Sequence, residues 1–235
     1  MLPTKSTSMT LPGYRASMPL SIPSPHDRFP FTVNIARDES LLSAIEIRAE
    51  AYGRHIPELG VKFREADELD VEAGVTVLVA TSKDDGRPLG TIRIQTNQFR
   101  PLLIEQAIAI PDQEHMMLAE LTRLAVCQKP IGRIAKHALF KATYEYCLQA
   151  GIDRLVIGAR SPLDRQYRGL GFEDLYPGVG PIPLAYAGNI PHHILYSDIA
   201  TASAKWKSTG NPIYEFLTVP NHPDIHLEKN AIFRT

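Results

Sequence analysis

The stretch MLAELTRLAVCQKP, residues 117–130, places two charged side chains inside an apolar run. Its leucines, alanines and valine have the composition of a buried strand, which we expect over residues 119–126. Glu120 and Arg123 interrupt that strand, and a buried charge is costly unless a partner compensates it. The stretch therefore indicates a strand that holds these two charges for a specific reason.

Composition and charge limit the classes of protein to which this chain can belong. The 235 residues, 44% of them hydrophobic, suffice for a full core, and a formal charge of -1 with an isoelectric point near 6.7 argues against wholesale nucleic-acid binding. Cys127 and Cys147 form no CxxC pair and the histidines have no ligand spacing, so we expect neither disulfide nor metal. Apolar runs are too short for a signal peptide or a membrane span, so we expect a soluble, cytoplasmic protein.

The pattern along the chain predicts an N-terminal arm and one α/β domain. Residues 1–30 are rich in Ser, Thr and Pro, which indicates an arm, followed by a single domain over 31–235 with a C-terminal extension from about residue 175. We expect strands over 31–36, 75–82, 89–95, 119–126, 153–159 and 192–199, and helices over 41–56, 132–151 and around 200–208. The acidic READELD, residues 64–70, is expected to be a loop. This order is typical of a mixed α/β fold.

Several spaced motifs resemble one superfamily, the GNAT acyltransferases. In SPLDRQYRGLGFEDL, residues 161–175, a Tyr stands shortly before a Gly-Phe pair, as in that superfamily. More specifically, the chain resembles acyl-homoserine-lactone synthases and the related bacterial N-acyl amino acid synthases over about residues 40–175. The residues that resemble these groups in order and spacing are Arg48, Tyr52, Asp67, Asp70, Arg93, Glu120, Arg123 and Tyr167.

This resemblance implies a fold and a reaction. The expected fold is the GNAT fold, a mixed central sheet flanked by helices, with two central strands splayed apart to admit a thioester. The expected reaction moves a long fatty acyl group from a carrier thioester to the amine of an amino-acid-like acceptor. The resemblance implies no tightly bound cofactor, because the acyl donor is a substrate.

The loop that holds the donor's phosphates departs from the superfamily pattern. That pattern resembles Arg/Gln-x-x-Gly-x-Gly/Ala, whose small residues let backbone N–H groups reach a pyrophosphate. In KPIGRIA, Lys129 and Gly132 fit, but Ile134 occupies the second small position and Pro130 has no N–H. This favours acyl carrier protein, which presents a single phosphodiester, over coenzyme A. The expected donor-binding residues are Leu124, Ala125, Val126, Lys129, Gly132 and Arg133.

A second departure concerns the acceptor. The lactone synthases have a Trp some ten residues after the first-helix Arg, whereas this chain has Glu58 in that region and its only Trp is Trp206. The lactone synthase that uses S-adenosylmethionine is therefore the second hypothesis. A non-catalytic GNAT-fold module that binds an acylated carrier or a lipid is the third, and a coenzyme A acetyltransferase is disfavoured by the departing loop.

Aminolysis of a thioester needs a neutral amine, so a carboxylate must collect the ammonium proton. Glu120 is the expected general base, and backbone N–H groups around residues 124–126 are expected to polarise the thioester carbonyl. The resemblance implies that Tyr167 protonates the leaving thiolate. The alternatives are that Glu120 only pairs with an arginine and that Tyr167 only packs.

A charged cluster is expected around the acceptor. In a regular strand Glu120 and Arg123 would point to opposite faces, so Arg123 is expected to meet Asp67 or Asp70 instead. Arg48 and Arg93 would complete the cluster, and one of them would grip the acceptor's carboxylate, with Tyr52 nearby. The alternative is that Arg123 and Asp70 form only a buried structural pair.

Basic residues near the expected thioester site indicate an acidic partner. Lys129, Arg133, Lys136 and Lys141 occur at the start and along one side of the long helix, and Arg160, Arg165 and Arg168 follow. Carrier proteins are acidic, so a positive surface would steer one toward the site. The expected carrier contacts are Lys136, Arg165 and Arg168, and the alternative is a merely solvated face.

Overall fold

Residues 117–130 form a strand in the middle of the sheet and the first residue of a long helix. In the computed structural model, which describes residues 22–111 and 113–227, β4 (Leu118–Val126) precedes α3 (Pro130–Ala150). The described strands form one sheet in the order β6-β8-β5-β4-β3-β2-β1-β9, with β7 paired to β8. The other strands are β1 (Phe31–Ile35), β2 (Val75–Ser82), β3 (Pro88–Thr96), β5 (Arg154–Ala159), β6 (Glu173–Asp174), β7 (Ile182–Leu184), β8 (Ile190–Asp198) and β9 (Ile225–His226).

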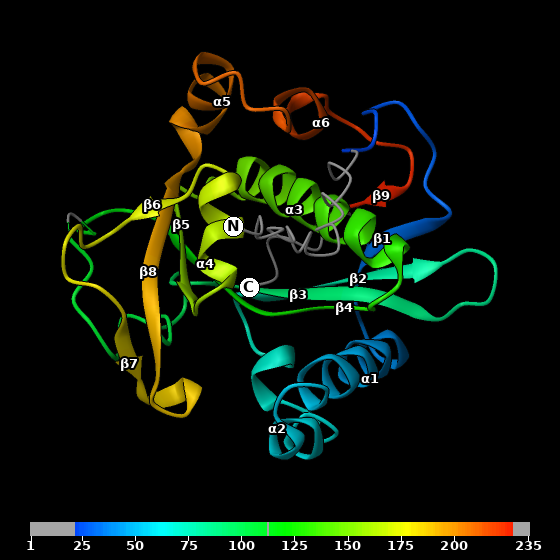
Figure 1. Cartoon of the computed structure of the whole chain (residues 1–235), viewed down its shortest axis with the longest axis horizontal. Helices are drawn as coiled ribbons and strands as arrows, with labels where there is room; N and C mark the ends of the chain where they lie inside the picture. The colour runs from blue at the N-terminus through cyan, green and yellow to red at the C-terminus, as the bar shows by residue number, and fades with distance from the viewer. Residues whose placement is uncertain (1–21, 112, 228–235) are drawn as a thin grey trace, which may run out of the picture.

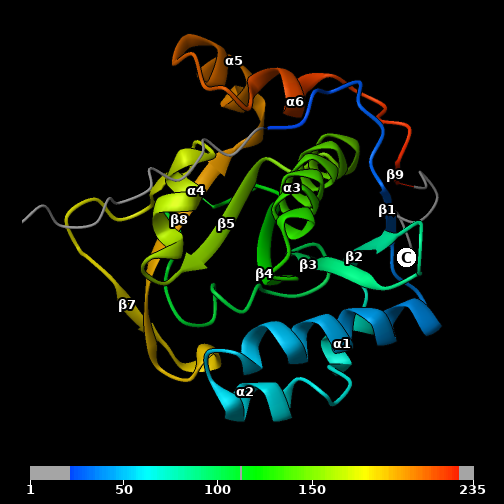
Figure 2. The same cartoon turned by 45° about the vertical axis from the view of Figure 1, so that its right-hand side comes forward.

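Helices cover both faces of this sheet (Figures 1 and 2). α1 and α2 lie together against one face, while α3 lies across the opposite face with α4 beside it and with α5 and α6 beyond it. The bounds are α1 (Glu39–Gly53), α2 (Pro57–Lys62), α4 (Leu163–Gly169), α5 (Ile199–Ser208) and α6 (Tyr214–Thr218), with 3-10 turns η1 (Glu68–Val71) and η2 (Ala185–Ala187). The acidic loop expected at 64–70 thus includes the start of η1.

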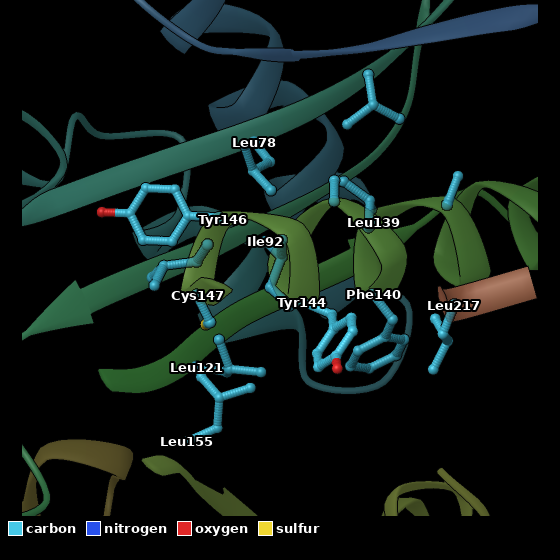
Figure 3. Packing of buried hydrophobic residues seen from close by; sticks show 14 of the residues in the cluster. Leu78, Ile92, Leu121, Leu139, Phe140, Tyr144, Tyr146, Cys147, Leu155 and Leu217 are labelled. Atoms are coloured by element: carbon cyan, nitrogen blue, oxygen red, sulfur yellow. The ribbon is translucent and has the colours of Figure 1, made fainter. Parts of the chain in front are cut away.

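The main core lies between α3 and the sheet (Figure 3). Leu78, Ile92 and Leu121, from three neighbouring strands, and Leu139 and Cys147, from α3, are all buried there. α3 also turns small alanines to this face, which lets the helix lie close to the sheet. Its end is set by Gly151, which adopts a left-handed conformation with φ of 66°.

The two central strands part, as the resemblance implies. β4 and β5 pair in parallel only from Leu118/Arg154 to Glu120/Val156, although both strands continue beyond that point. The register of β4 against β3 shifts near Arg123, whose φ is 56°. An extra residue in one strand bends it locally, and a left-handed arginine is uncommon. This bulge accompanies the divergence of β4 from β5.

The segment from about residue 175 contributes strands to the sheet, among them β8, which includes most of the strand expected at 192–199. β8 pairs with β5 along Arg154–Ala159, so it occupies an internal position, and β9 pairs with β1 at the far edge. The described end of the N-terminal arm also packs inward, with the Phe29 and His222 rings stacked 3.9 Å apart. Residues 1–21 of the predicted arm lie outside the described residues. Within the described ranges, no helix combines the length and apolarity that a bilayer span requires.

Candidate active site

A cavity of about 870 Å³ occupies the gap where β4 and β5 part. Residues 121–126 of β4 line one wall, and Ile157 to Ala159 of β5 line the other. α1 contributes Tyr52 from one face of the sheet, while α3 and α4 contribute side chains from the other face. The cavity therefore runs between two neighbouring strands and can be reached from both layers of helices.

Glu120 lies where the strands separate and is completely buried. Its Oε1 accepts a hydrogen bond from the Tyr186 hydroxyl at 2.8 Å, and its Oε2 accepts one from the backbone N–H of Ile104 at 3.0 Å. Burial raises the pKa of the Glu120 carboxyl to about 7, although both hydrogen bonds and the charge of Arg93 oppose the rise. A carboxyl with a pKa near neutrality can both take up and release a proton at physiological pH.

These hydrogen bonds argue against the alternative that Glu120 serves only as the ion-pair partner of an arginine. Its hydrogen bonds come from a tyrosine and from backbone, and Leu118, Leu102 and Ile104 belong to the apolar cluster on that face. Neither Tyr186 nor Ile104 was expected from the sequence. Tyr186 is 66 residues from Glu120 along the chain and belongs to a short turn, so no local pattern marks it.

The charged cluster forms around Asp67 and Asp70. Arg93 Nη1 lies 2.7 Å from Asp67 Oδ2 and 3.4 Å from Asp70 Oδ1, while Arg123 Nη2 lies 3.1 Å from Asp67 Oδ2. Arg48 pairs with the other Asp70 oxygen. Burial alone would raise the pKa of Asp67, but the guanidinium groups of Arg93 and Arg123 hold it below its usual value. The contact expected between Arg123 and the acidic segment is therefore present, with Asp67 as its partner.

The arginines of the cluster differ in their access to the cavity. Arg48 and Arg93 are each 1% exposed and are not among the residues that line it. Arg123 lines the cavity instead and lies over the Phe63 ring, 4.4 Å from its centroid. The argument from a regular strand fails at Arg123, because its positive φ breaks the alternation of side chains.

Two tyrosines, one from each layer of helices, line the cavity. Tyr52 from α1 packs edge-on against Phe63, with ring centroids 4.7 Å apart, and Tyr167 from α4 packs edge-on against Phe140 at 5.8 Å. Both line the cavity, and burial raises the pKa of each hydroxyl. At neutral pH both therefore stay protonated. Tyr167 combines a packing role with a hydroxyl on the cavity wall.

The expected donor-binding residues separate into two groups. Leu124, Ala125, Val126 and Arg133 line the cavity, while Lys129 and Gly132 do not. Gly132 instead allows the first turn of α3 to approach β4, because a Cβ at this position would lie 2.1 Å from the Cys127 carbonyl oxygen. Its observed role is close packing.

The basic residues also separate by position. Arg133 and Arg165 are exposed, and Lys136 donates to Gln166 at 2.6 Å across the α3–α4 contact. We call Lys129, Arg133, Lys136 and Arg165 the basic rim. Lys141 was wrongly expected among these residues: it is fully buried and lies 3.0 Å from Glu145 Oε1. Arg168 forms a bidentate pair with Asp174, at 2.7 and 2.8 Å, so its guanidinium is already engaged.

The described residues contain no group of three or more His, Cys, Asp or Glu side chains arranged to hold a metal ion. Two of the histidines that line the cavity are His137, which is buried, and His192, which is partly buried. Burial lowers the pKa of His137 to about 4 and lowers that of His192, so both rings are neutral near pH 7. At the point where β4 and β5 part, burial raises the pKa of the Glu120 carboxyl to about 7.

The split sheet, with a cavity between its parted strands, has the GNAT acyltransferase fold. More particularly, the chain belongs to the FeeM family of N-acyl amino acid synthases, because the family model "N-acyl amino acid synthase FeeM" matches residues 43–183, more than half of the chain. The protein is therefore an N-acyl amino acid synthase. Membership implies an acyl-thioester donor and an amino-acid acceptor.

Solved structures agree on the fold. FeeM from uncultured soil microbes has 18% sequence identity and a TM-score of 0.60, over 76% of this chain and 96% of that one. BjaI, a coenzyme A-dependent acyl-homoserine lactone synthase solved with S-adenosylmethionine and isopentyl-coenzyme A, has 17% identity and a TM-score of 0.54, over 77% and 90%. TofI, solved with an inhibitor and MTA, has 16% identity and a TM-score of 0.53, over 75% and 96%. A search of curated proteins gave no match.

Proposed function

We propose that this enzyme transfers a long-chain acyl group from acyl carrier protein to the α-amine of an amino acid, with Glu120 as general base. The observation that supports this most is the buried carboxyl with a pKa of about 7 at the point where β4 and β5 part. An amino acid's ammonium cannot attack a thioester until it loses a proton. A carboxylate poised near neutrality suits that task, whereas a module that only binds has no need of one.

The proposed reaction proceeds by direct attack. The ammonium loses one proton toward Glu120, and the neutral nitrogen then forms a bond to the thioester carbon. Backbone N–H groups of residues 124–126, on the cavity wall, stabilise the oxyanion. The carbon–sulfur bond breaks with its electron pair on sulfur, which takes a proton from the Tyr167 hydroxyl. The second proton released by the nitrogen restores Tyr167.

The two substrates are proposed to enter from opposite faces. The donor's phosphopantetheine arm would come from the side of α3 and α4, where Arg133 and Lys136 line the cavity and offer positive charge to a phosphodiester. The acceptor would come from the side of α1, where Tyr52 and Arg123 line the cavity. Arg123 is the proposed partner of the acceptor's carboxylate, since it is the member of the charged cluster on the cavity surface.

The preference for acyl carrier protein rests on the start of α3. Pro130 is the first residue of this helix and contributes no N–H, and Ile134 stands where a small residue favours a pyrophosphate. A single phosphodiester demands fewer N–H groups. The basic rim adjoins the same end of the cavity and is suited to an acidic carrier.

Product analysis tests the proposed reaction. The purified protein is incubated with a long-chain acyl carrier protein or the matching acyl-coenzyme A, together with all amino acids, and products are identified by mass spectrometry. A parallel tube contains S-adenosylmethionine. We expect an N-acyl amino acid, formed faster from the carrier-bound donor. Product only in the parallel tube would support a lactone synthase, and no product in either would favour the binding module.

The basic rim gives a separate prediction about the donor. Arg165→Glu reverses an exposed charge on α4 outside the cavity, so it should raise KM for acyl carrier protein about threefold to tenfold, because charge at a rim mainly alters association. KM for acyl-coenzyme A should not change. Arg87→Glu, in the exposed β2–β3 turn, is the matched control. An equal effect of Arg165→Glu on both donors would contradict a carrier surface here.

A further inference from the structure

Glu120 is sealed from the cavity that its proposed substrate occupies. Its side chain is 0% exposed, and it is not among the residues that line the cavity, although its neighbours Leu121 and Thr122 are. A base that removes a proton needs contact with the donor, directly or through one intervening group. The structure therefore raises the question of how a proton travels from the cavity to Glu120.

The Tyr186 hydroxyl lies near both Glu120 and Gly158 of β5, although Tyr186 itself is not among the cavity-lining residues. Its hydroxyl donates to Glu120 Oε1 at 2.8 Å, and a Cβ at Gly158 would lie 3.6 Å from the same hydroxyl. Gly158 belongs to β5 and lines the cavity. The same Cβ would lie 2.8 Å from Leu184 Cδ1, so Leu184 and Tyr186 pack directly against the Gly158 backbone. The Tyr186 hydroxyl thus lies next to a cavity-lining residue on one side and bonds the buried carboxylate on the other.

Other groups define the electrostatic setting of this contact. Glu120 is faced by the Tyr186 hydroxyl from η2, by the Ile104 N–H from the loop before β4, and by the charge of Arg93 from β3. The charge of Arg123 from β4 acts on Tyr186. Burial and the neighbouring Glu120 raise the pKa of the Tyr186 hydroxyl, so a free tyrosinate is disfavoured. Any proton passed through this hydroxyl must enter and leave together.

We propose that Tyr186 relays the proton of the acceptor's ammonium to Glu120, an inference that rests on the proposed function of Glu120 as base. The phenolic oxygen accepts the ammonium proton as its own hydroxyl proton moves to Glu120 Oε1. The amine and the tyrosine are then neutral, and Glu120 is protonated, so charge and protons balance. In this proposal the amine reaches the Tyr186 hydroxyl beside the Gly158 backbone, so Tyr186 is in this sense catalytic, and a side chain at Gly158 would collide with Leu184, whose Cδ1 would lie 2.8 Å from the added Cβ.

Tyr186→Phe removes the relay and keeps the ring. We expect kcat near pH 7 to fall by about tenfold or more, with KM for the acyl donor unchanged. Near pH 10 the bulk solvent deprotonates the amine, so the defect should shrink to about threefold or less. A purely structural loss would persist at every pH. Tyr176→Phe is the matched control, since this ring packs in the same apolar cluster, and it should retain the parent rate.

Glu120→Gln, measured in the same series, separates the two proposals. Loss of activity in Glu120→Gln with a normal rate in Tyr186→Phe would overturn the relay and leave the base intact. Full activity in Glu120→Gln would overturn the proposed function itself. The unaltered enzyme gives an independent result: single-turnover rates in mixtures of light and heavy water should depend on deuterium fraction along a curve, because two protons move together. A linear dependence would contradict the relay.

Discussion

Replacement of Glu120 by Gln is expected to lower kcat at neutral pH by about 10² to 10⁴-fold, the range typical of a lost general base. The amide retains the shape of the carboxyl: its single oxygen can accept from the Ile104 N–H, and its NH2 can donate to the Tyr186 hydroxyl, at the positions where Glu120 accepts at 3.0 and 2.8 Å. It cannot take up a proton. Acyl donor binding should therefore be unchanged while turnover is lost, which rapid-quench measurement of amide formation can show.

Glu114→Gln is the matched control for this change. Glu114 is exposed on the segment before β4, so the same loss of charge there should leave kcat near the parent value. Equal turnover in Glu120→Gln and the parent would contradict the role of Glu120. A parallel rise in donor KM would indicate instead that Glu120 shapes the donor site.

The second large effect is expected on stability. Asp70→Asn leaves Arg48 without its acidic partner at a site where the two side chains are 2% and 4% exposed. Removing one member of a buried ion pair costs about 3–5 kcal/mol, because the remaining charge is buried without compensation. We expect the free energy of unfolding, measured by urea titration, to fall by about this amount.

Two other substitutions serve as comparisons for the loss of stability expected in Asp70→Asn. Asp67 is 29% exposed in its side chain, so Asp67→Asn should cost less than Asp70→Asn, because water can reach the arginines that remain. Asp84→Asn, in the exposed β2–β3 turn, should change stability by less than about 0.5 kcal/mol. If Asp70→Asn cost no more than Asp84→Asn, the charged cluster would not be a structural support of the cavity.

Much of the fold follows from local patterns in the sequence. The strand expected at 75–82 agrees with β2, and the long helix expected at 132–151 agrees with α3, because alternation and helical periodicity are local properties. The resemblance correctly indicated the GNAT fold and its parted strands. The position of β8 inside the sheet depends on long-range pairing with β5, so no short pattern indicates it.

The site was only partly predictable for the same reason. The sequence correctly predicted that Arg123 contacts the acidic segment at Asp67. It could not predict which arginine lines the cavity, because that depends on the bulge at Arg123, where the register of β4 against β3 shifts. The burial of Lys141 arises from its contact with the carbonyl of Val219, far along the chain. Tyr186 likewise lies in the turn between β7 and β8, and it reaches Glu120 through the long-range arrangement of that hairpin.

The most direct test of the account is the pH dependence of kcat for amide formation between about pH 5 and pH 9, which reports ionisation in the enzyme–substrate complex. Burial raises the pKa of Glu120 to about 7, so below that pH the carboxyl is protonated and cannot act as a base. We predict that kcat falls about tenfold for each unit below pH 7 in the parent and levels off above it, whereas the residual rate of Glu120→Gln keeps rising through pH 7 to 9, because solvent alone then deprotonates the amine. The same levelling off above pH 7 in both enzymes would contradict the assignment of Glu120 as the base.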